Sequence, residues 1–398
     1  QPAMTTSPTS QAQLFTQNAV DFITSEDLER KLQRGGPLRV KFGMDPSSPD
    51  LHVGHMVQLR KLRDLQDAGH QIVLIVGDAT AMVGDPSGRN KLQPQLTREQ
   101  VEENLVTYTE QARLVLDMER TEVRRNSEWF DAMDFQAMLK LTSRMTVARM
   151  IERDTFQKRM QDQEPIGIHE FLYPLMQGWD SVEVRADLEL GGTDQLFNLL
   201  VGRNFQEQEG QERQVCFTLP LINGLDGRKM SKSYGNYVGL TDAPNDMFGK
   251  LMSLEDGAME TWFRLLTRLP DEERAEVLAG HPRQAKARLA SELVTFLHGS
   301  DAAAGASEAF DRQFRDKGLP DDIPEHPWPA PGEELPLFLV IAKLGLAKSG
   351  SEARRLVQQG AVRLDDVVQD DANRSLAAPS EPVLLRVGKR RYATLLPA

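Results

Sequence analysis

The chain has 398 residues, of which 40% are hydrophobic and 27% charged, and this composition excludes collagen-like, low-complexity and disulfide-scaffold proteins. No apolar run approaches the ~20 residues that cross a bilayer, so we expect no membrane partner. The 47 Lys and Arg against 59 Asp and Glu leave a net charge of −12. That charge argues against a protein that coats nucleic acid through bulk positive charge.

The cysteine content indicates a reducing compartment. Cys216 has no partner for an intrachain disulfide and lies in the apolar run Gln-Val-Cys-Phe-Thr-Leu, which is typical of a buried strand. We therefore expect a core residue in a cytoplasmic protein. Residues 1–20 contain no Lys or Arg and no long apolar run, so we expect no signal or transit peptide and Met4 as the natural start.

The pattern in chain order predicts an α/β fold with a Rossmann-like parallel sheet. We expect residues 1–18 to be disordered and 19–241 to form the sheet domain, with strands at 38–42 and 71–76 and a helix at 52–68 between them. The capping box of Thr97 and Gln100 opens a helix that runs to about Met118. Folds of this kind bind ligands at the carboxyl ends of their strands.

The second half of the chain changes character twice. Residues 242–317 carry charged helical segments and no strand signals, which predicts a helical domain. Residues 318–334 form an expected linker, since the window 318–332 contains five prolines and two glycines. Residues 335–398 then show two helical stretches followed by strands at 383–387 and 392–396, which predicts a small α+β domain.

The sequence His52-Val-Gly-His55 follows the first strand and its loop. Both imidazoles share one face of the first helical turn, where unpaired backbone N–H groups and the helix dipole favour phosphate. Gly54 allows close approach of a ligand. A pair of capping or core histidines, or two metal ligands, is the alternative.

Two further patterns carry chemistry. The segment Lys229-Met-Ser-Lys-Ser233 could close over a polyphosphate with its lysines, although solvated loops of this composition are common. Tyr173, Gln177 and Asp180 share one helical face, and the Tyr and Gln oxygens together with Asp85 could accept an ammonium group. Taken alone, that face could equally be an ordinary helix surface.

These motifs occur in the order found in class I aminoacyl-tRNA synthetases, and the chain from about Leu28 to its end resembles the bacterial tyrosyl-tRNA synthetases. The matching blocks run from Phe42 to His55, from Gly77 to Gly88, from Tyr173 to Asp180, from Gly191 to Gln195 and through the lysine loop. The resemblance implies activation of L-tyrosine with ATP to tyrosyl-adenylate and pyrophosphate, followed by transfer of tyrosine to tRNA(Tyr).

The resemblance also assigns site residues. It implies catalytic contacts to the ATP phosphates from His52, His55, Lys229 and Lys232. It implies further nucleotide contacts from Asp45, Ser47, Gly54, Gly192, Asp194, Met230, Ser231 and Ser233. It implies that the tyrosine substrate lies among Thr80, Asp85, Tyr173, Gln177, Asp180 and Gln195. Mg²⁺ should accompany ATP, and no dedicated protein metal site is expected.

For the rest of the chain the resemblance implies a homodimer formed through residues 133–164 and anticodon recognition by 242–317. It also implies an RNA-binding tail of the ribosomal protein S4 type. Residues 338–398 carry ten Lys and Arg against six Asp and Glu, so a local basic face can meet tRNA despite the negative total. Its candidate tRNA contacts are Arg354, Arg355, Arg386, Lys389, Arg390 and Arg391.

The sequence departs from the family pattern at two positions. Many relatives have a tyrosine where this chain has Lys41, so recognition of the substrate hydroxyl would depend more on Asp180. Relatives often carry an arginine near Gln93, and Arg89 or Lys91 would have to replace it.

Three other functions remain as alternatives. A tryptophanyl-tRNA synthetase would share the fold and both motifs, and another adenylyltransferase could use the histidine pair. A non-catalytic RNA-binding relative, such as a splicing or regulatory protein, would need neither motif intact.

Overall fold

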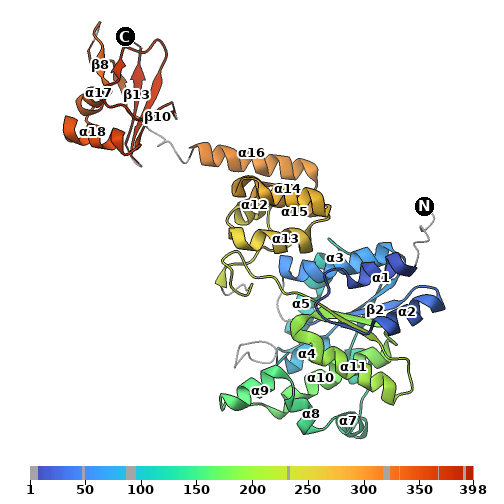
Figure 1. The fold of residues 1–398 in the computed structure, drawn as a ribbon. Helices are drawn as coiled ribbons and strands as arrows, with labels where there is room; N and C mark the ends of the chain where they lie inside the picture. The colour runs from blue at the N-terminus through green and yellow to red at the C-terminus, as the bar shows by residue number, and fades with distance from the viewer. Residues whose placement is uncertain are drawn as a thin grey trace. The chain divides into compact units, whose positions relative to one another are not determined.

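The computed structural model describes residues 8–46, 50–86, 96–230, 234–316, 323–330, 332–365, 367–388 and 391–397. The chain divides into two compact units, residues 1–307 and 308–398 (Figure 1). No helix in these ranges is long and apolar enough to span a membrane.

A six-stranded sheet in the order β1-β6-β5-β2-β3-β4 forms the centre of the first unit. Its strands are β1 (Phe22–Ile23), β2 (Arg39–Met44), β3 (Gln71–Val76), β4 (Thr121–Arg125), β5 (Leu188–Gly192) and β6 (Val215–Leu219). Strands β2 to β6 pair in parallel, and β1 pairs antiparallel with β6 at one edge. The predicted parallel α/β sheet is therefore confirmed.

The central strands lie where their apolar pattern predicts them. In β3 the five residues after Gln71 are buried, as expected for a strand covered on both faces. In β6, Cys216 is fully buried, and burial raises the pKa of its thiol well above the usual value. The interpretation of Cys216 as a core residue is confirmed.

Helices cover both faces of this sheet, with α1 and α3 on one side and α10 and α11 on the other (Figure 1). The capping box at Thr97 forms as predicted, but α5 ends at Ala112 rather than near Met118. The helices of this region are α1 (Pro8–Thr16), α2 (Ser25–Arg34), α3 (Val53–Asp67), α4 (Asp78–Val83), α5 (Arg98–Ala112), α6 (Ser127–Phe130), α7 (Phe135–Thr142), α8 (Val147–Ile151), α9 (Asp154–Gln161), α10 (Leu172–Glu183) and α11 (Leu196–Gln208).

The expectation of disorder over residues 1–18 is wrong for its second half. Residues 8–16 form α1, and Phe15 is fully buried with its ring centroid 4.9 Å from that of His70. Lys61 Nζ donates to the carbonyl oxygens of Leu14 and Gln17. A short polar segment is thus ordered by one aromatic anchor and one lysine from α3, which local composition does not reveal.

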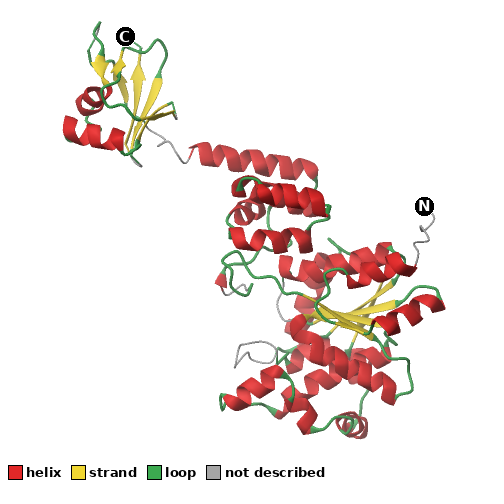
Figure 2. Cartoon of the chain, in the orientation of Figure 1, coloured by secondary structure: helices red, strands yellow, loops and turns green. Residues whose placement is uncertain are grey.

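After the sheet domain the chain is helical, as predicted, in α12 (Pro244–Met252), α13 (Met259–Leu266), α14 (Asp271–Ala279), α15 (Pro282–His298) and α16 (Ser300–Asp316) (Figure 2). The second unit contains a five-stranded sheet in the order β10-β9-β12-β13-β7. Its elements are β7 (Glu325–Pro327), β8 (Leu335–Pro336), α17 (Leu337–Lys343), α18 (Gly350–Gln358), β9 (Val362–Leu364), β10 (Val367–Gln369), β11 (Ser375–Leu376), β12 (Val383–Val387) and β13 (Arg391–Leu396).

The predicted linker over 318–334 needs correction in its second part. Strand β7 pairs in parallel with β13, and Trp328 is buried in the core of the second unit. Trp328 Nε1 donates to the Glu333 carbonyl oxygen. The folded second unit therefore begins before Leu335, while residues 317–322 lie outside the described ranges.

Replacement of Phe15 by Ala tests the order of α1. We expect a loss of about 3–5 kcal/mol in the free energy of unfolding, because a fully buried aromatic side chain is removed. The exposed Gln13 of the same helix provides the control Gln13→Ala, which should unfold like the wild type in urea. Equal unfolding midpoints for both variants would show that α1 does not pack on the body.

Candidate active site

The two histidines of the first motif cap the start of α3. His52 Nδ1 accepts the Gly54 backbone N–H at 3.1 Å, and His55 Nδ1 accepts the His52 backbone N–H at 3.2 Å. A neutral imidazole that accepts at Nδ1 carries its proton on Nε2. Both rings therefore present an Nε2–H donor at the positive end of a helix, and their centroids lie 4.0 Å apart.

The chain on either side of the lysine loop lies against this helix start. The Val53 backbone N–H donates to the Val238 carbonyl oxygen at 2.9 Å. A Cβ on Gly54 would come within 2.8 Å of the His52 ring and 3.5 Å of Met230 Sδ, so glycine admits the close approach. The histidine motif and the chain around the lysine loop, which are far apart in the sequence, therefore lie against each other in the fold. Ser47, Ser231, Lys232 and Ser233 lie outside the described residues.

A hydrogen-bonded chain connects four elements at the carboxyl ends of the strands. The Tyr173 hydroxyl donates to Asp45 Oδ2 at 2.7 Å, and the Thr80 hydroxyl donates to Asp45 Oδ1 at 2.8 Å. Asn126 Nδ2 donates to both Thr80 Oγ1, at 3.1 Å, and Asp180 Oδ2, at 3.4 Å. One polar chain therefore runs from Asp45, assigned to the nucleotide, to Asp180, assigned to the substrate hydroxyl.

Asp180 is a buried carboxyl at the inner end of this chain. It is 3% exposed, and Trp129 Nε1 donates to its Oδ1 at 3.0 Å. Desolvation raises its pKa to about 7, against the lowering effects of the Lys41 charge and of the hydrogen bonds from Trp129 and Asn126. Desolvation likewise raises the pKa of Asp45 to about 7, although Tyr173 and Thr80 donate to it. Both carboxyls titrate near neutral pH.

The residues predicted to bind the ammonium group are held by side chains that the sequence analysis did not identify. Asp85 accepts from Arg153 Nη2 at 3.1 Å and from Gln195 Nε2 at 2.9 Å. Asn198 Nδ2 donates to Gln195 Oε1 at 2.8 Å and to Gln177 Oε1 at 2.9 Å. The Tyr173 hydroxyl donates to Asp45, and its oxygen keeps lone pairs with which it could accept from an ammonium group, so the ammonium site stays a prediction.

Lys41, the departure noted in the sequence, is fully buried. Its ammonium group donates to the Gln177 carbonyl oxygen at 2.7 Å and to Ser181 Oγ at 2.8 Å, and it lies 2.9 Å from Glu189 Oε1. An ammonium has three protons, and these three acceptors use them all. Lys41 therefore acts on Asp180 through its charge and through α10.

The glycine pair at the end of β5 lies against Asp194, which we assigned to the nucleotide. A Cβ on Gly192 would lie 2.7 Å from Asp194 Oδ1 and 2.8 Å from the Leu221 side chain, so only glycine fits without displacement. Desolvation and the nearby Asp85 raise the pKa of Asp194, and the charge of Lys229 opposes them. Lys229 and Asp194 thus approach the same site.

Five contributors were absent from the sequence prediction: Asn126, Trp129, Arg153, Glu189 and Asn198. Asn126 follows β4 directly, so the rule that ligands bind beyond the carboxyl ends of parallel strands could have identified it. Trp129, Arg153 and Glu189 carry no local signal, because their partners Asp180, Asp85 and Lys41 lie far away in the sequence. Asn198 lies three positions after Gln195, one of its two partners, so that spacing could have identified it.

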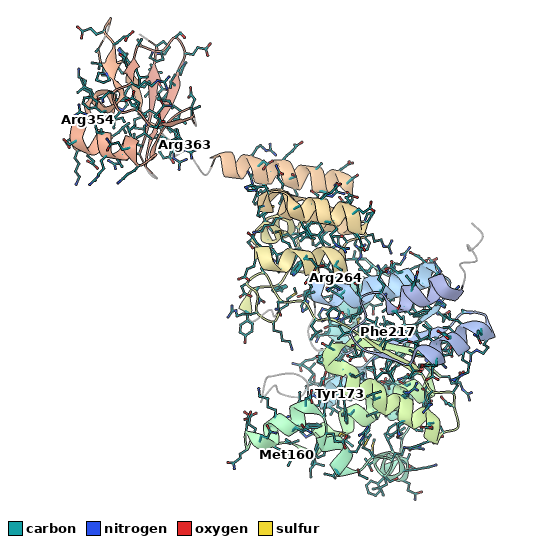
Figure 3. All side chains as sticks on the ribbon, viewed as in Figure 1. Met160, Tyr173, Phe217, Arg264, Arg354 and Arg363 are labelled. Carbon is teal, nitrogen blue, oxygen red and sulfur yellow. The ribbon has the colours of Figure 1, made fainter. Side chains whose placement is uncertain are left out.

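The candidate RNA contacts of the second unit are distributed over α18 and two strands. Arg354 and Arg355 are exposed on α18, and the Arg354 guanidinium lies 3.7 Å from the Phe338 ring centroid (Figure 3). Arg386 stands opposite Arg363 across β12 and β9, and Arg391 Nη1 donates to the Leu346 carbonyl oxygen. Lys389 and Arg390 lie outside the described ranges.

Comparisons with known proteins agree with this geometry. The profile of the family described as tRNA synthetases class I (W and Y) matches residues 33–315, and that of the S4 domain matches 335–378. The fold and site thus define a class I tRNA synthetase.

Sequence relatives narrow the class. Tyrosine–tRNA ligases from Thermotoga maritima and Oleidesulfovibrio alaskensis are each 49% identical, covering 97% of this chain and 97% and 98% of theirs. A tyrosyl-tRNA synthetase from Archaeoglobus fulgidus, solved with L-tyrosine, superposes with a TM-score of 0.61 at 25% identity over 76% of this chain and 100% of its own. The chain belongs to the tyrosine–tRNA ligase family.

Substitution of Trp129 by Phe tests the electrostatics of Asp180. The indole N–H lowers the pKa of this carboxyl from the value that burial alone would impose. We therefore expect Trp129→Phe to move the pKa of Asp180 above about 7, measured by carbon-13 NMR of the labelled carboxyl groups. Trp179→Phe, which removes an indole donor to Glu183, is the control and should leave the Asp180 titration in place.

Proposed function

We propose that the described site binds tyrosine with its phenol toward Asp180 and its α-amino and carboxylate groups toward the histidine motif. The hydrogen-bonded chain from Asp45 to Asp180 supports this proposal, since it joins the carboxyl that we assign to the nucleotide to the carboxyl that we assign to the substrate hydroxyl. Asp85, Gln177 and Gln195, which are joined by hydrogen bonds through Asn198, would face the substrate ammonium.

Adenylate formation then needs positioning rather than a general base. The tyrosine carboxylate, ionised at neutral pH, attacks the α-phosphorus of ATP, and the bond from that phosphorus to the pyrophosphate oxygen breaks. The Nε2–H groups of His52 and His55 would donate to phosphate oxygens, and Lys229 and Lys232 would stabilise the departing pyrophosphate. A ribose hydroxyl at the 3′ end of tRNA(Tyr) then attacks the tyrosyl carbonyl and releases AMP.

Mg²⁺ would be bound by the phosphates of ATP rather than by a metal site of the protein. Within the part of the chain that the structure describes, no three His, Cys, Asp or Glu side chains are grouped to hold a metal ion. The cation would then offset phosphate charge while His52 and His55 orient the same oxygens.

A role in tRNA charging also has consequences for the second unit and for the cellular location of the protein. We propose that tRNA is contacted by the candidate arginines and lysine of the S4 domain and by residues 242–317 at the anticodon. The S4 profile match and the exposed arginines of α18 support this assignment. A cytoplasmic location accords with a single buried cysteine and with a role in protein synthesis.

The decisive experiment is amino-acid-dependent pyrophosphate exchange with tyrosine, tryptophan and phenylalanine. We expect exchange with tyrosine, and a loss of roughly tenfold to hundredfold in kcat/KM for tyrosine in Asp180→Asn, because the phenol then meets a weaker acceptor. Exchange driven by tryptophan, or exchange without any amino acid, would contradict the proposal.

The raised pKa of Asp180 gives this experiment a pH signature. Below about pH 7 the carboxyl is protonated and accepts the phenol proton poorly, so the tyrosine-to-phenylalanine ratio of kcat/KM should rise as pH increases through 7. The titration of Asp45 affects both substrates and cancels in the ratio. In Asp180→Asn the ratio should be flat with pH, and a wild-type ratio that does not change would exclude the assigned role.

We also propose a homodimer formed by the region of α7 to α9. This region exposes large apolar side chains that a second copy would cover: Phe135 77%, Leu139 53%, Val147 62% and Met160 52% exposed, with Ile168 85% exposed just beyond (Met160 is labelled in Figure 3). Clusters of such side chains are typical of protein interfaces.

Phe135→Asp tests the dimer. A charge in the centre of an apolar interface should give a monomer by light scattering at micromolar concentration. Val367→Asp, at an exposed apolar position of the second unit (63% against 77% for Phe135), is the matched control and should leave the mass unchanged. A monomeric wild type would contradict the proposal.

A further inference from the structure

A polar cavity lies in the first unit, outside the site described above. Its volume is about 330 Å³, within the range of ligand pockets, and it is lined by residues of α3, of the segment after α1 and of the α13–α14 region (Arg264 is labelled in Figure 3). Five cations line it against two carboxylates, Asp64 and Asp271; the cations are Arg60, Lys61, Arg264, Arg268 and Arg274.

Three of these cations already have carboxylate partners. Arg264 pairs with Glu260 at 3.2 Å, Arg274 pairs with Asp271 at 3.0 Å, and Arg268 pairs with Asp64. These residues contribute positive surroundings, but their charges are compensated within the chain.

Arg60 and Lys61 differ because each is only 7% exposed and neither forms an ion pair within 4 Å in the described part of the chain. The Arg60 guanidinium lies 4.3 Å from the Phe296 ring centroid, a contact that uses none of its five N–H donors as a hydrogen bond. Lys61 donates to two backbone carbonyl oxygens, of Leu14 and Gln17, and its third proton has no acceptor there.

Buried charges are usually paired, since removing an ion from water is costly without a counter-charge. Burial disfavours the charged forms of both side chains: it lowers the pKa of Arg60 to about 10 and that of Lys61 to about 8. Glu292 and Asp64 raise the pKa of Arg60 and Arg268 lowers it, so the charges around the cavity do not cancel the desolvation. An anion in the cavity would supply the missing counter-charge.

We propose that this cavity is a phosphate-binding site in which Arg60 and Lys61 hold the anion, with Arg264, Arg268 and Arg274 at its rim. A guanidinium fork matches two phosphate oxygens, and an adjacent ammonium adds a point charge. The phosphate could belong to a free phosphate ion or small phosphate ester, or to a phosphodiester of RNA. The two sources share this chemistry and differ in the experiment.

The first measurement is thermal unfolding of the full chain with inorganic phosphate against chloride at equal ionic strength. Phosphate bound only by the folded state should raise the midpoint of the wild type by roughly 2–4 °C near saturation. Arg60→Met should lose this increment. Arg63→Met on the same helix removes an arginine that does not line the cavity and should keep it. Phosphate bound at the ATP site would raise the midpoints of the wild type and of Arg60→Met alike. The difference between their two increments therefore reports the cavity alone.

Arg60→Met should fold, because it removes an uncompensated buried charge and Met can pack on Phe296. Should it fail to fold, Lys61→Met provides the same test from the neighbouring cation.

The second measurement separates the two sources. If RNA supplies the phosphate, Arg60→Met should raise the KM for tRNA about tenfold, as for one lost charge-assisted hydrogen bond, while tyrosine-dependent pyrophosphate exchange is unchanged. If a small phosphate does, the KM for tRNA stays at the wild-type value and only the thermal increment is lost. The proposal is overturned if Arg60→Met and Lys61→Met both respond to phosphate and tRNA as the wild type does.

Discussion

The buried ion pair between Lys41 and Glu189 sets the position of α10 on the sheet, and the amino-acid side of the site depends on it. The two residues face each other across β2 and β5 and are at most 1% exposed. Such a pair is tolerated only when the remaining protons and lone pairs are satisfied. The Gln177 carbonyl and the Ser181 hydroxyl complete the ammonium, while Ser181 and Gln214 donate to the carboxylate. The helical turn that carries Asp180 is thereby tied to the centre of the sheet.

Beyond α10, a polar chain runs from Asp180 through Asn126 and Thr80 to Asp45. Burial leaves Asp180 and Asp45 titrating near neutral pH, so each depends strongly on the donors around it. The same low dielectric makes an unpaired polar group costly, which lets a buried carboxyl distinguish a phenol from a bare ring. Contacts within one helix turn contribute to the orientation of the histidine motif. Backbone N–H groups of its own turn donate to both rings.

Local patterns accordingly predicted the local features well. The strand at 71–76, the capping box at Thr97, the histidine motif at the start of α3 and the face shared by Tyr173, Gln177 and Asp180 all lie where periodicity put them. The errors arose where one distant contact outweighs composition. Phe15 orders α1 by inserting beside His70, and Trp328 draws the end of the proline-rich segment into the second unit. Neither residue stands in a periodic apolar pattern.

Sequence patterns alone identified the α/β class, the histidine and lysine motifs, the helical face shared by Tyr173, Gln177 and Asp180, and the local positive charge of the tail. Each depends on residue type and on spacings of a few positions. The folded chain alone reveals that Tyr173 donates to Asp45, 128 positions away, and that Asn126 joins Thr80 to Asp180. It also reveals that Glu189 and two oxygens of α10 take up all three protons of the Lys41 ammonium group. The physical reason is that a buried polar group takes the partner that folding brings within about 3 Å, and spacing along the chain carries no record of that choice.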